Sequence, residues 1–518
     1  MRTRRIGREA FLSILLAAVC FLPGLSLRAQ SSVKVEAHWD RVIRISRTSA
    51  SPLVVSNPLL RLGSSIHGQA FKELHDLNSD YVDYLAWCPY PKLGVAELEP
   101  PHDGKTFWDF SAMDPLVEDF LEATEGHPVI LDFSTIPQWM FITSEPVPYP
   151  RDPNQVAWSY SQGTELRDPS MMELTDYYVR LASWYSKGGF ADEYGKWHES
   201  GHHYKIDYWG VGNEVDAEHS TTPEQYVARY DAIVGAMRRV IPNSKFVGPY
   251  LADPSPIHAK IPRFFEYFLD PKNHKPGIPI DMLAYHFYAM PASDESFDVL
   301  KYCVFDHVDR LLDVARYIDL MRQRFRPHAK TILNEMGIIM PQDFDQGSPG
   351  YVYKSYPEVY RNLYGAVWAY AYGELTRLGL DVVGESQLVG QPGQFPSVAL
   401  LDWNTGKPFA SFLVLKLVNM NFGPGDKVVE TSVSMPPAPD FVPAFVAATG
   451  FVTRDGKKKL LLVNKRDRAF EVSIPGGADA EVQVVDQTTD SSGPRTSTLT
   501  TDQLSLGGFG VAVVTLRN

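Results

Sequence analysis

The sequence predicts an α/β protein, a (β/α)₈ TIM barrel with an additional β-sandwich domain. From about residue 58 to residue 424, strand-like apolar runs alternate with helical patterns, which is typical of a parallel sheet. Eight such units fit in this span, and eight is the number of units that closes a barrel of this kind. From residue 425 to residue 518, short alternating runs are separated by turns rich in Pro, Gly and Asp, which indicates a sandwich.

Eight runs are predicted to form the barrel strands, because each is short, largely apolar and followed by a helical pattern. The helix after the fourth run is predicted to begin at Thr222-Pro223, because Thr caps helices and Pro suits the first helical position. In chain order the predicted strands are 59–64, 81–87, 128–134, 204–214, 245–250, 281–288, 330–337 and 381–386.

The N-terminal strands are predicted to join the C-terminal sandwich. Residues 33–37 and 42–45 alternate between apolar and polar side chains, as half-exposed strands do. We therefore expect residues 31–57 to lie in the same domain as the end of the chain. The predicted C-terminal strands are 428–435, 444–452, 459–464, 470–474, 481–486 and 511–516.

Residues 1–30 are predicted to form a signal peptide. Four arginines lie among the first eight residues, followed by an apolar run from Ala10 to Leu22 and a small-residue cleavage site near Ala29. The apolar run is shorter than a membrane-spanning helix requires. We expect a secreted or periplasmic protein that does not insert into a membrane after cleavage.

The composition excludes some classes of partner. The formal net charge of −13 argues against nucleic acid or an anionic membrane surface. The sequence contains neither an HExxH metal motif nor a glycine-rich phosphate loop, so we expect no metal and no cofactor. The 10 Trp, 26 Tyr and 27 Phe would suit stacking on sugar rings, which favours an oligosaccharide or polysaccharide fragment as partner.

Two glutamates mark the predicted site. Glu214 ends the fourth predicted strand and Glu335 lies near the end of the seventh, each directly after an Asn. Catalytic groups of such barrels lie at the C-terminal ends of strands, so the two carboxyl groups should meet over one site. Hydrolysis of a glycosidic bond needs such a pair, one carboxyl group to protonate the leaving oxygen and one to face the anomeric carbon.

This pattern resembles the glycoside hydrolases of clan A, and within that clan it is most similar to family 39, the β-xylosidase and α-L-iduronidase group. The resemblance covers about residues 58–425. The family commonly shows Trp-Asn-Glu-Pro where this chain has Gly-Asn-Glu-Val, which places the chain in a divergent branch. The segments that carry the resemblance are 208–214, 222–226, 245–249, 284–288 and 332–335.

The resemblance implies a role for each matching residue. Glu214 would be the general acid/base and Glu335 the nucleophile of a retaining, double-displacement mechanism. Asn213 would bind the sugar 2-hydroxyl, and Tyr288 would hold the nucleophile by a hydrogen bond.

Three further residues are candidates for substrate contact from their positions alone. Trp87 ends the second predicted strand and Trp139 follows the third, so each could stack on a sugar ring or pack in the core. His286 lies two residues before Tyr288, so both side chains should point the same way.

The predicted function is that of a retaining glycoside hydrolase, with β-xylosidase-like specificity as the first expectation. Two alternatives stay open. One is an exo-acting uronidase or glucosidase on the same scaffold, and a basic residue in the sugar subsite would favour the uronidase. The other is a carbohydrate-binding protein without activity, which the presence of both Glu214 and Glu335 disfavours.

Overall fold

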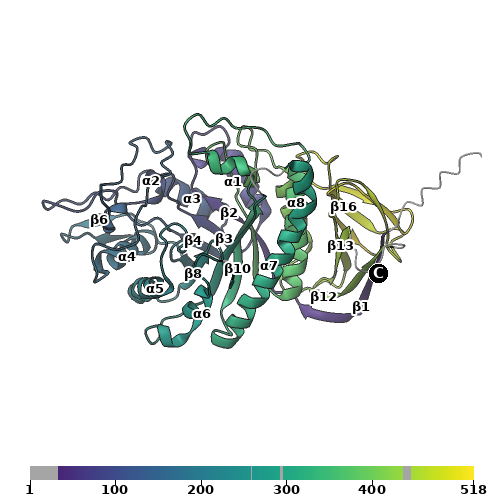
Figure 1. The fold of residues 1–518 in the computed structure, drawn as a ribbon, viewed down its shortest axis with the longest axis horizontal. Coiled ribbons are helices and arrows are strands. Elements are labelled where there is room, and N and C mark those ends of the chain that lie inside the picture. The colour runs from purple at the N-terminus through teal and green to yellow at the C-terminus, as the bar shows by residue number, and fades with distance from the viewer. Residues whose placement is uncertain (1–32, 258, 292–295, 436–444, 518) are drawn as a thin grey trace, which may run out of the picture.

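The computed structural model describes residues 33–257, 259–291, 296–435 and 445–517. The predicted signal peptide lies outside these residues. The barrel and the sheet domain lie side by side, with α8 (Tyr360–Leu378) on the face of the barrel that meets the sheet (Figure 1). Among the described residues, none of the helices is both long enough and apolar enough to cross a membrane.

Eight parallel strands close the barrel, as the sequence predicts. Backbone hydrogen bonds join each adjacent pair of strands, and the pairing of β9 with β10 closes the ring. In the order around the ring the strands are β10 (Lys330–Ile338), β11 (Val382–Glu385), β2 (Ser49–Val55), β3 (Val82–Leu85), β4 (Val129–Asp132), β7 (Tyr208–Gly210), β8 (Lys245–Leu251) and β9 (Met282–Ala289).

Helices surround the ring and bury one face each against it. Helix α5 begins as predicted: the Thr222 hydroxyl accepts a hydrogen bond from the Gln225 amide, and the Gln225 side chain accepts one from the Thr222 amide. The helices are α1 (His67–Leu77), α2 (Pro91–Gly94), α3 (Asp114–Ala123), α4 (Met172–Lys187), α5 (Pro223–Met237), α6 (Phe264–Leu269), α7 (Phe297–Phe325), α8 (Tyr360–Leu378) and α9 (Ala410–Asn421).

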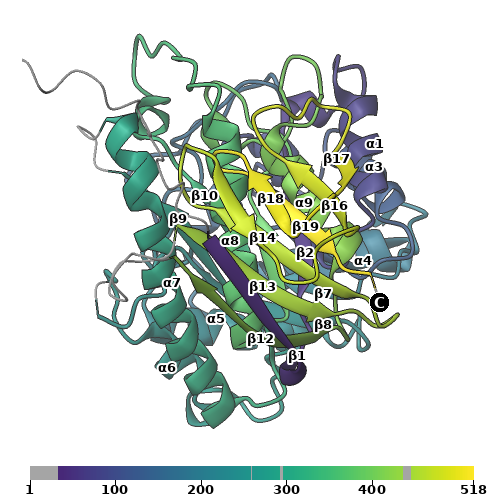
Figure 2. The same ribbon diagram turned by 90° about the vertical axis from the view of Figure 1, so that its right-hand side faces the viewer.

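The second domain is a mixed sheet of nine described strands that lies against α8 and α9 (Figure 2). Strand β1 (Val33–Ile45) pairs antiparallel with β12 (Lys427–Ser434), so both ends of the chain contribute to this domain, as predicted. The other strands are β13 (Val446–Val452), β14 (Lys458–Asn464), β15 (Phe470–Ser473), β16 (Glu481–Val485), β17 (Arg495–Thr498), β18 (Gln503–Leu506) and β19 (Val511–Thr515). Strands β5 (Gly189–Ala191) and β6 (Trp197–Glu199) form a separate hairpin.

The first barrel strand was predicted at the wrong place. It is β2, residues Ser49–Val55, which pairs with β11 and β3. The residues expected in its place, 59–64, form a short 3₁₀ helix (Pro58–Leu60) and a turn. All seven residues of β2 are buried, so no polar alternation marks the strand, and Pro52 is unusual inside a sheet. The assignment of residues 49–57 to the sandwich is corrected accordingly.

Close contact between β10 and β11 requires a glycine at position 384. A Cβ atom added to Gly384 would lie 2.5 Å from the backbone oxygen of Asn334, which cannot move away as a flexible side chain could. Gly384→Ala should therefore lower the free energy of unfolding by about 1–3 kcal/mol, measured by urea unfolding. Gly68→Ala is the control, because this exposed helical position has open space and alanine should stabilise it by up to about 1 kcal/mol. Equal stabilities for the two variants would contradict this packing argument.

Candidate active site

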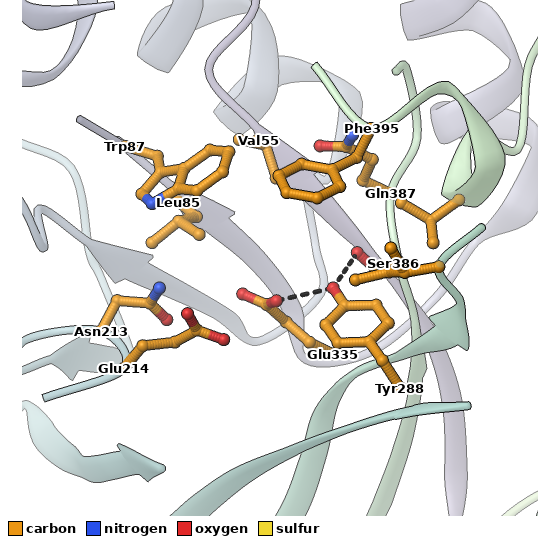
Figure 3. Close-up of a pocket in the computed structure, with 12 residues that line it drawn as sticks. Val55, Leu85, Trp87, Asn213, Glu214, Tyr288, Glu335, Ser386, Gln387 and Phe395 are labelled. Carbon is orange, nitrogen blue, oxygen red and sulfur yellow. Dashed lines mark hydrogen bonds between the residues drawn. The ribbon is translucent and has the colours of Figure 1, made fainter. Parts of the chain in front are cut away.

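A cavity opens at the C-terminal ends of the barrel strands (Figure 3). It contains about 410 Å³ of empty space, part of it open to solvent. Polar groups lie on one side and apolar or aromatic side chains on the other. The lining residues are Val55, Leu85, Trp87, Asn213, Glu214, Tyr288, Glu335, Ile339, Ser386, Gln387, Phe395 and Val398.

Glu335 is fixed by neighbours on the next strand. It lies on β10 with its side chain 9% exposed. The Tyr288 hydroxyl, from β9, donates a hydrogen bond of 2.7 Å to Glu335 Oε2. The same hydroxyl lies 2.9 Å from that of Ser386, so the tyrosine is itself held on its other side (Figure 3).

Glu214 is held in a strained backbone conformation. It follows β7 and has φ of 40°, a left-handed conformation that non-glycine residues rarely adopt. Gly212, two residues before it, has φ of 77°, and a Cβ there would lie 2.9 Å from a methyl group of Val215. Strain of this kind persists only where the surrounding structure imposes it, and it is concentrated at functional sites.

His286 joins the two glutamates. This fully buried side chain lies on β9, and its Nδ1 is 3.0 Å from Glu214 Oε1 and 3.4 Å from Glu335 Oε2. One oxygen of each glutamate and a nitrogen of His286 all lie within 4.8 Å of one another. The two carboxyl groups predicted from the sequence to meet do so, with an imidazole ring between them.

The charges of these groups depend on one another. Burial alone would lower the pKa of His286, but the nearby carboxylates of Glu335 and Glu214 outweigh burial and raise it to about 9. Burial raises the pKa of Glu335, whereas the His286 imidazolium and the Tyr288 hydroxyl favour its carboxylate form. The site at neutral pH therefore contains a cation held between two acids.

Two further acids lie inside the barrel below this trio. The Asn334 amide is 3.5 Å from the Asp83 carboxyl group, across strands that are not adjacent in the ring. Asp132 packs against Gly210, where a Cβ atom would lie 2.5 Å from the Asp132 carboxyl carbon. Burial, with the charge of Glu335, raises the pKa of Asp83 to about 8, and burial raises that of Asp132 well above its usual range. Asp83 is therefore largely neutral at pH 7, and burial disfavours the charged form of Asp132.

The trio is the only group of side chains in the described residues spaced to approach a metal ion. The proton on His286 Nδ1, which its raised pKa favours, occupies the position that a metal would need. The expectation that the protein uses no metal or cofactor stays a prediction.

The remaining predicted residues divide into two groups. Trp87 and Asn213 line the cavity, as expected for residues that contact substrate. Trp139 does not: its indole nitrogen donates to the Glu97 carbonyl oxygen, and the Arg167 guanidinium covers its ring at 4.5 Å. His286 is also placed differently, because it lies behind the glutamates and binds them instead of facing the cavity.

Several cavity residues were missed by sequence reasoning. Ser386, Gln387 and Phe395 follow β11 in a segment without a distinctive motif. Glu218 was also missed, although it lies only four residues after Glu214; its Oε1 accepts hydrogen bonds from Trp87 Nε1 at 2.6 Å and from Asn213 Nδ2 at 3.2 Å. Glu385, another carboxylate at the end of a barrel strand (β11), is buried and is not among the residues that line the cavity.

The charge on His286 should make stability depend on pH. Its pKa of about 9 lies above the ordinary 6.5, so this stabilisation is complete below about pH 6.5 and is lost as the pH rises through about 9. The shift corresponds to about 3 kcal/mol. In urea unfolding, His286→Gln should be destabilised most at low pH, with a difference from the unmodified protein that shrinks towards pH 9. The control, His102→Gln at an exposed position, should show no such trend; parallel pH curves for the His286 variant would contradict the assignment.

Comparison with known proteins supports the fold. A family model for the C-terminal immunoglobulin-like domain of D-apionate lactonase matches residues 443–514. No curated protein matches the chain.

Solved structures match over nearly the whole chain. The GH51 arabinofuranosidase from Xanthomonas axonopodis pv. citri has a TM-score of 0.60 and 12% identity, covering 94% of this chain and 100% of its own. The α-L-arabinofuranosidase from Thermotoga maritima, in an arabinose complex, has a TM-score of 0.58 and 14% identity, and the match covers 94% of this chain and 99% of that one. The GH30 endoxylanase from Clostridium papyrosolvens C71 has a TM-score of 0.55 and 14% identity, and the match covers 94% of this chain and 100% of that one. The chain therefore shares the barrel-and-sandwich fold of these clan A glycoside hydrolases.

Proposed function

We propose that the protein is a retaining glycoside hydrolase. The observation that carries the proposal is the approach of Glu214 and Glu335 across one cavity, with carboxylate oxygens within 4.8 Å of each other. Carboxyl groups about 5–5.5 Å apart are typical of retaining enzymes, whereas inverting enzymes need about 6.5–9.5 Å to admit a water molecule. The close pair favours attack by a carboxylate on the sugar itself.

The two steps follow from the positions of the side chains. Glu335 attacks the anomeric carbon while Glu214 donates a proton to the leaving oxygen, giving a covalent glycosyl-enzyme. Glu214 then takes a proton from water, which attacks the same carbon and releases the sugar. Tyr288 and His286 hold Glu335 in position and favour its charged form before the attack.

The cavity favours a neutral sugar. None of its twelve lining residues is Lys or Arg, so the basic group that would favour a uronidase is missing from this lining. Trp87 and Phe395, with ring centroids 6.0 Å apart, offer an aromatic wall for a sugar face. Arabinofuranosidases and an endoxylanase among the similar structures act on pentose units, and we infer a β-xylose or related pentose unit first and a glucoside second. The N-terminal signal pattern supports export.

A sugar lactone is a second candidate substrate. It is favoured by the match of residues 443–514 to the C-terminal domain of D-apionate lactonase. That domain contributes none of the residues that line the cavity, so the match bears on the reaction only indirectly. Assays on neutral aryl glycosides and on aldonolactones separate the two reactions. Turnover of lactones alone would overturn the glycosidase proposal, and sugar binding without any turnover would indicate an inactive binding protein.

Replacement of Glu335 tests the nucleophile. Glu335→Ala should lower kcat on an aryl glycoside by at least about 10⁴-fold, because the glycosyl-enzyme cannot form. Added azide should restore turnover and give a glycosyl azide of the opposite anomeric configuration to the substrate, identified by NMR. Glu224→Gln, an exposed carboxylate in the first turn of α5, is the control and should keep full activity. Wild-type rates for Glu335→Ala would rule out the assigned role.

Replacement of Glu214 tests the general acid. Glu214→Ala should spare substrates whose leaving group needs no proton, such as dinitrophenyl glycosides, far more than alkyl glycosides. The difference between the two losses in kcat/KM should reach about 10²-fold or more. Equal losses on both substrates would show that Glu214 does not protonate the leaving group.

A further inference from the structure

Glu218 connects two walls of the cavity without lining it. It lies one helical turn beyond Glu214, and its Oε1 accepts from the Trp87 indole, 131 residues earlier in the chain, and from the Asn213 side-chain amide. Figure 3 shows the nitrogen atoms of Trp87 and Asn213 on the same side of the cavity, consistent with a shared acceptor. A single oxygen thus fixes the two side chains that would contact the sugar.

The hydrogen bond from Asn213 decides what the cavity offers to a ligand. Because Asn213 Nδ2 is occupied by Glu218, the other end of the amide, Oδ1, is left to face the site. That oxygen is buried and has no hydrogen-bond partner among the described residues. A buried acceptor without a partner is costly, so a ligand hydroxyl that donates to it would be favoured.

We propose that Glu218 is a positioning residue: it locks the Trp87 ring and the Asn213 amide so that the cavity presents one aromatic face and one hydrogen-bond acceptor to a neutral sugar. This inference rests on the proposed glycosidase function for its kinetic consequences, but the contacts themselves can be tested without turnover.

The surroundings of Glu218 favour its neutral form. Burial, with the charge of Glu214, raises the pKa of Glu218 to about 8, although the bonds from Trp87 and Asn213 oppose the shift. Glu335 from β10 also disfavours a charge at Glu218. Among the described residues, Asp132 from β4 and the thiol of Cys88, from the segment after β3, also interact with the charge of Glu218.

A neutral carboxyl group can be replaced closely by an amide. In Glu218→Gln the side-chain carbonyl oxygen can still accept from Trp87 and Asn213, whereas Glu218→Ala removes the acceptor and leaves both donors unpaired. The two variants therefore separate the hydrogen bonds from the ionisable group.

Kinetics test the positioning role. On a neutral aryl glycoside at pH 6.5, Glu218→Gln should keep kcat/KM within about threefold of the unmodified enzyme, and Glu218→Ala should lose about tenfold or more, largely in KM. These values correspond to one or two hydrogen bonds to a bound ligand or its contacts. Glu224→Gln, which changes an exposed carboxylate in the first turn of α5, is the control. Full activity and unchanged KM for Glu218→Ala would overturn the proposal.

The indole proton of Trp87 gives a readout that needs no turnover. In TROSY spectra of protein labelled with ¹⁵N-tryptophan, the Trp87 signal is assigned by its loss in Trp87→Phe. Its shift should titrate with a midpoint near pH 8 in the unmodified protein, stay constant in Glu218→Gln and move upfield in Glu218→Ala. A Trp87 indole signal that is unchanged by both substitutions would overturn the hydrogen bond between Trp87 and Glu218.

The kinetic assay and the NMR titration test the proposed function and the positioning role separately. If the unmodified protein hydrolyses no glycoside, the proposed function falls, and the NMR titration still decides whether Glu218 holds Trp87. If hydrolysis occurs but Glu218→Ala matches the unmodified enzyme, the glycosidase stands and the positioning role falls.

Discussion

The His286 imidazolium, placed between Glu214 and Glu335, is the interaction on which the site depends. Two carboxylates this close repel each other, and in a buried site that repulsion is only weakly screened. A protonated ring between them offsets the repulsion and also fixes the direction in which each carboxyl group points. Two further features hold the glutamates in place. The left-handed backbone conformation positions Glu214, and the hydrogen bond from Tyr288 positions Glu335.

Acids with raised pKa values around the trio contribute to this arrangement. Asp83, Asp132 and Glu218 all have raised pKa values, chiefly because burial penalises their charged forms. If all were ionised, one imidazolium could not balance them, and Glu335 would be driven to hold its proton. Burial disfavours the charged forms of these acids and of Glu335, and at Glu335 the His286 imidazolium and the Tyr288 hydroxyl oppose that effect.

The sequence predicted what local patterns encode. The barrel and the two Asn-Glu pairs could be found because each pair ends an apolar run, and the start of α5 because Thr222 and Pro223 are specific signals. Strand β2 could not be found, because full burial removes the alternation that marks a strand. Trp87 and Trp139 lie at or after the ends of predicted strands. Only the fold shows that Trp87 lines the cavity, whereas Arg167 covers the ring of Trp139. The role of Glu218 depends on a partner 131 residues away, which no local pattern reveals.

The pairing of β1 with β12 has a consequence for synthesis of the chain. Arg41 and Glu430, which form an ion pair across these strands, lie 389 residues apart. When the first strand leaves the ribosome, its partner has yet to be translated, so its edge stays unpaired while the barrel segments emerge. The second domain is completed only after its last strands follow. A polypeptide that stops early would therefore expose an open sheet edge, which quality-control proteases and chaperones recognise.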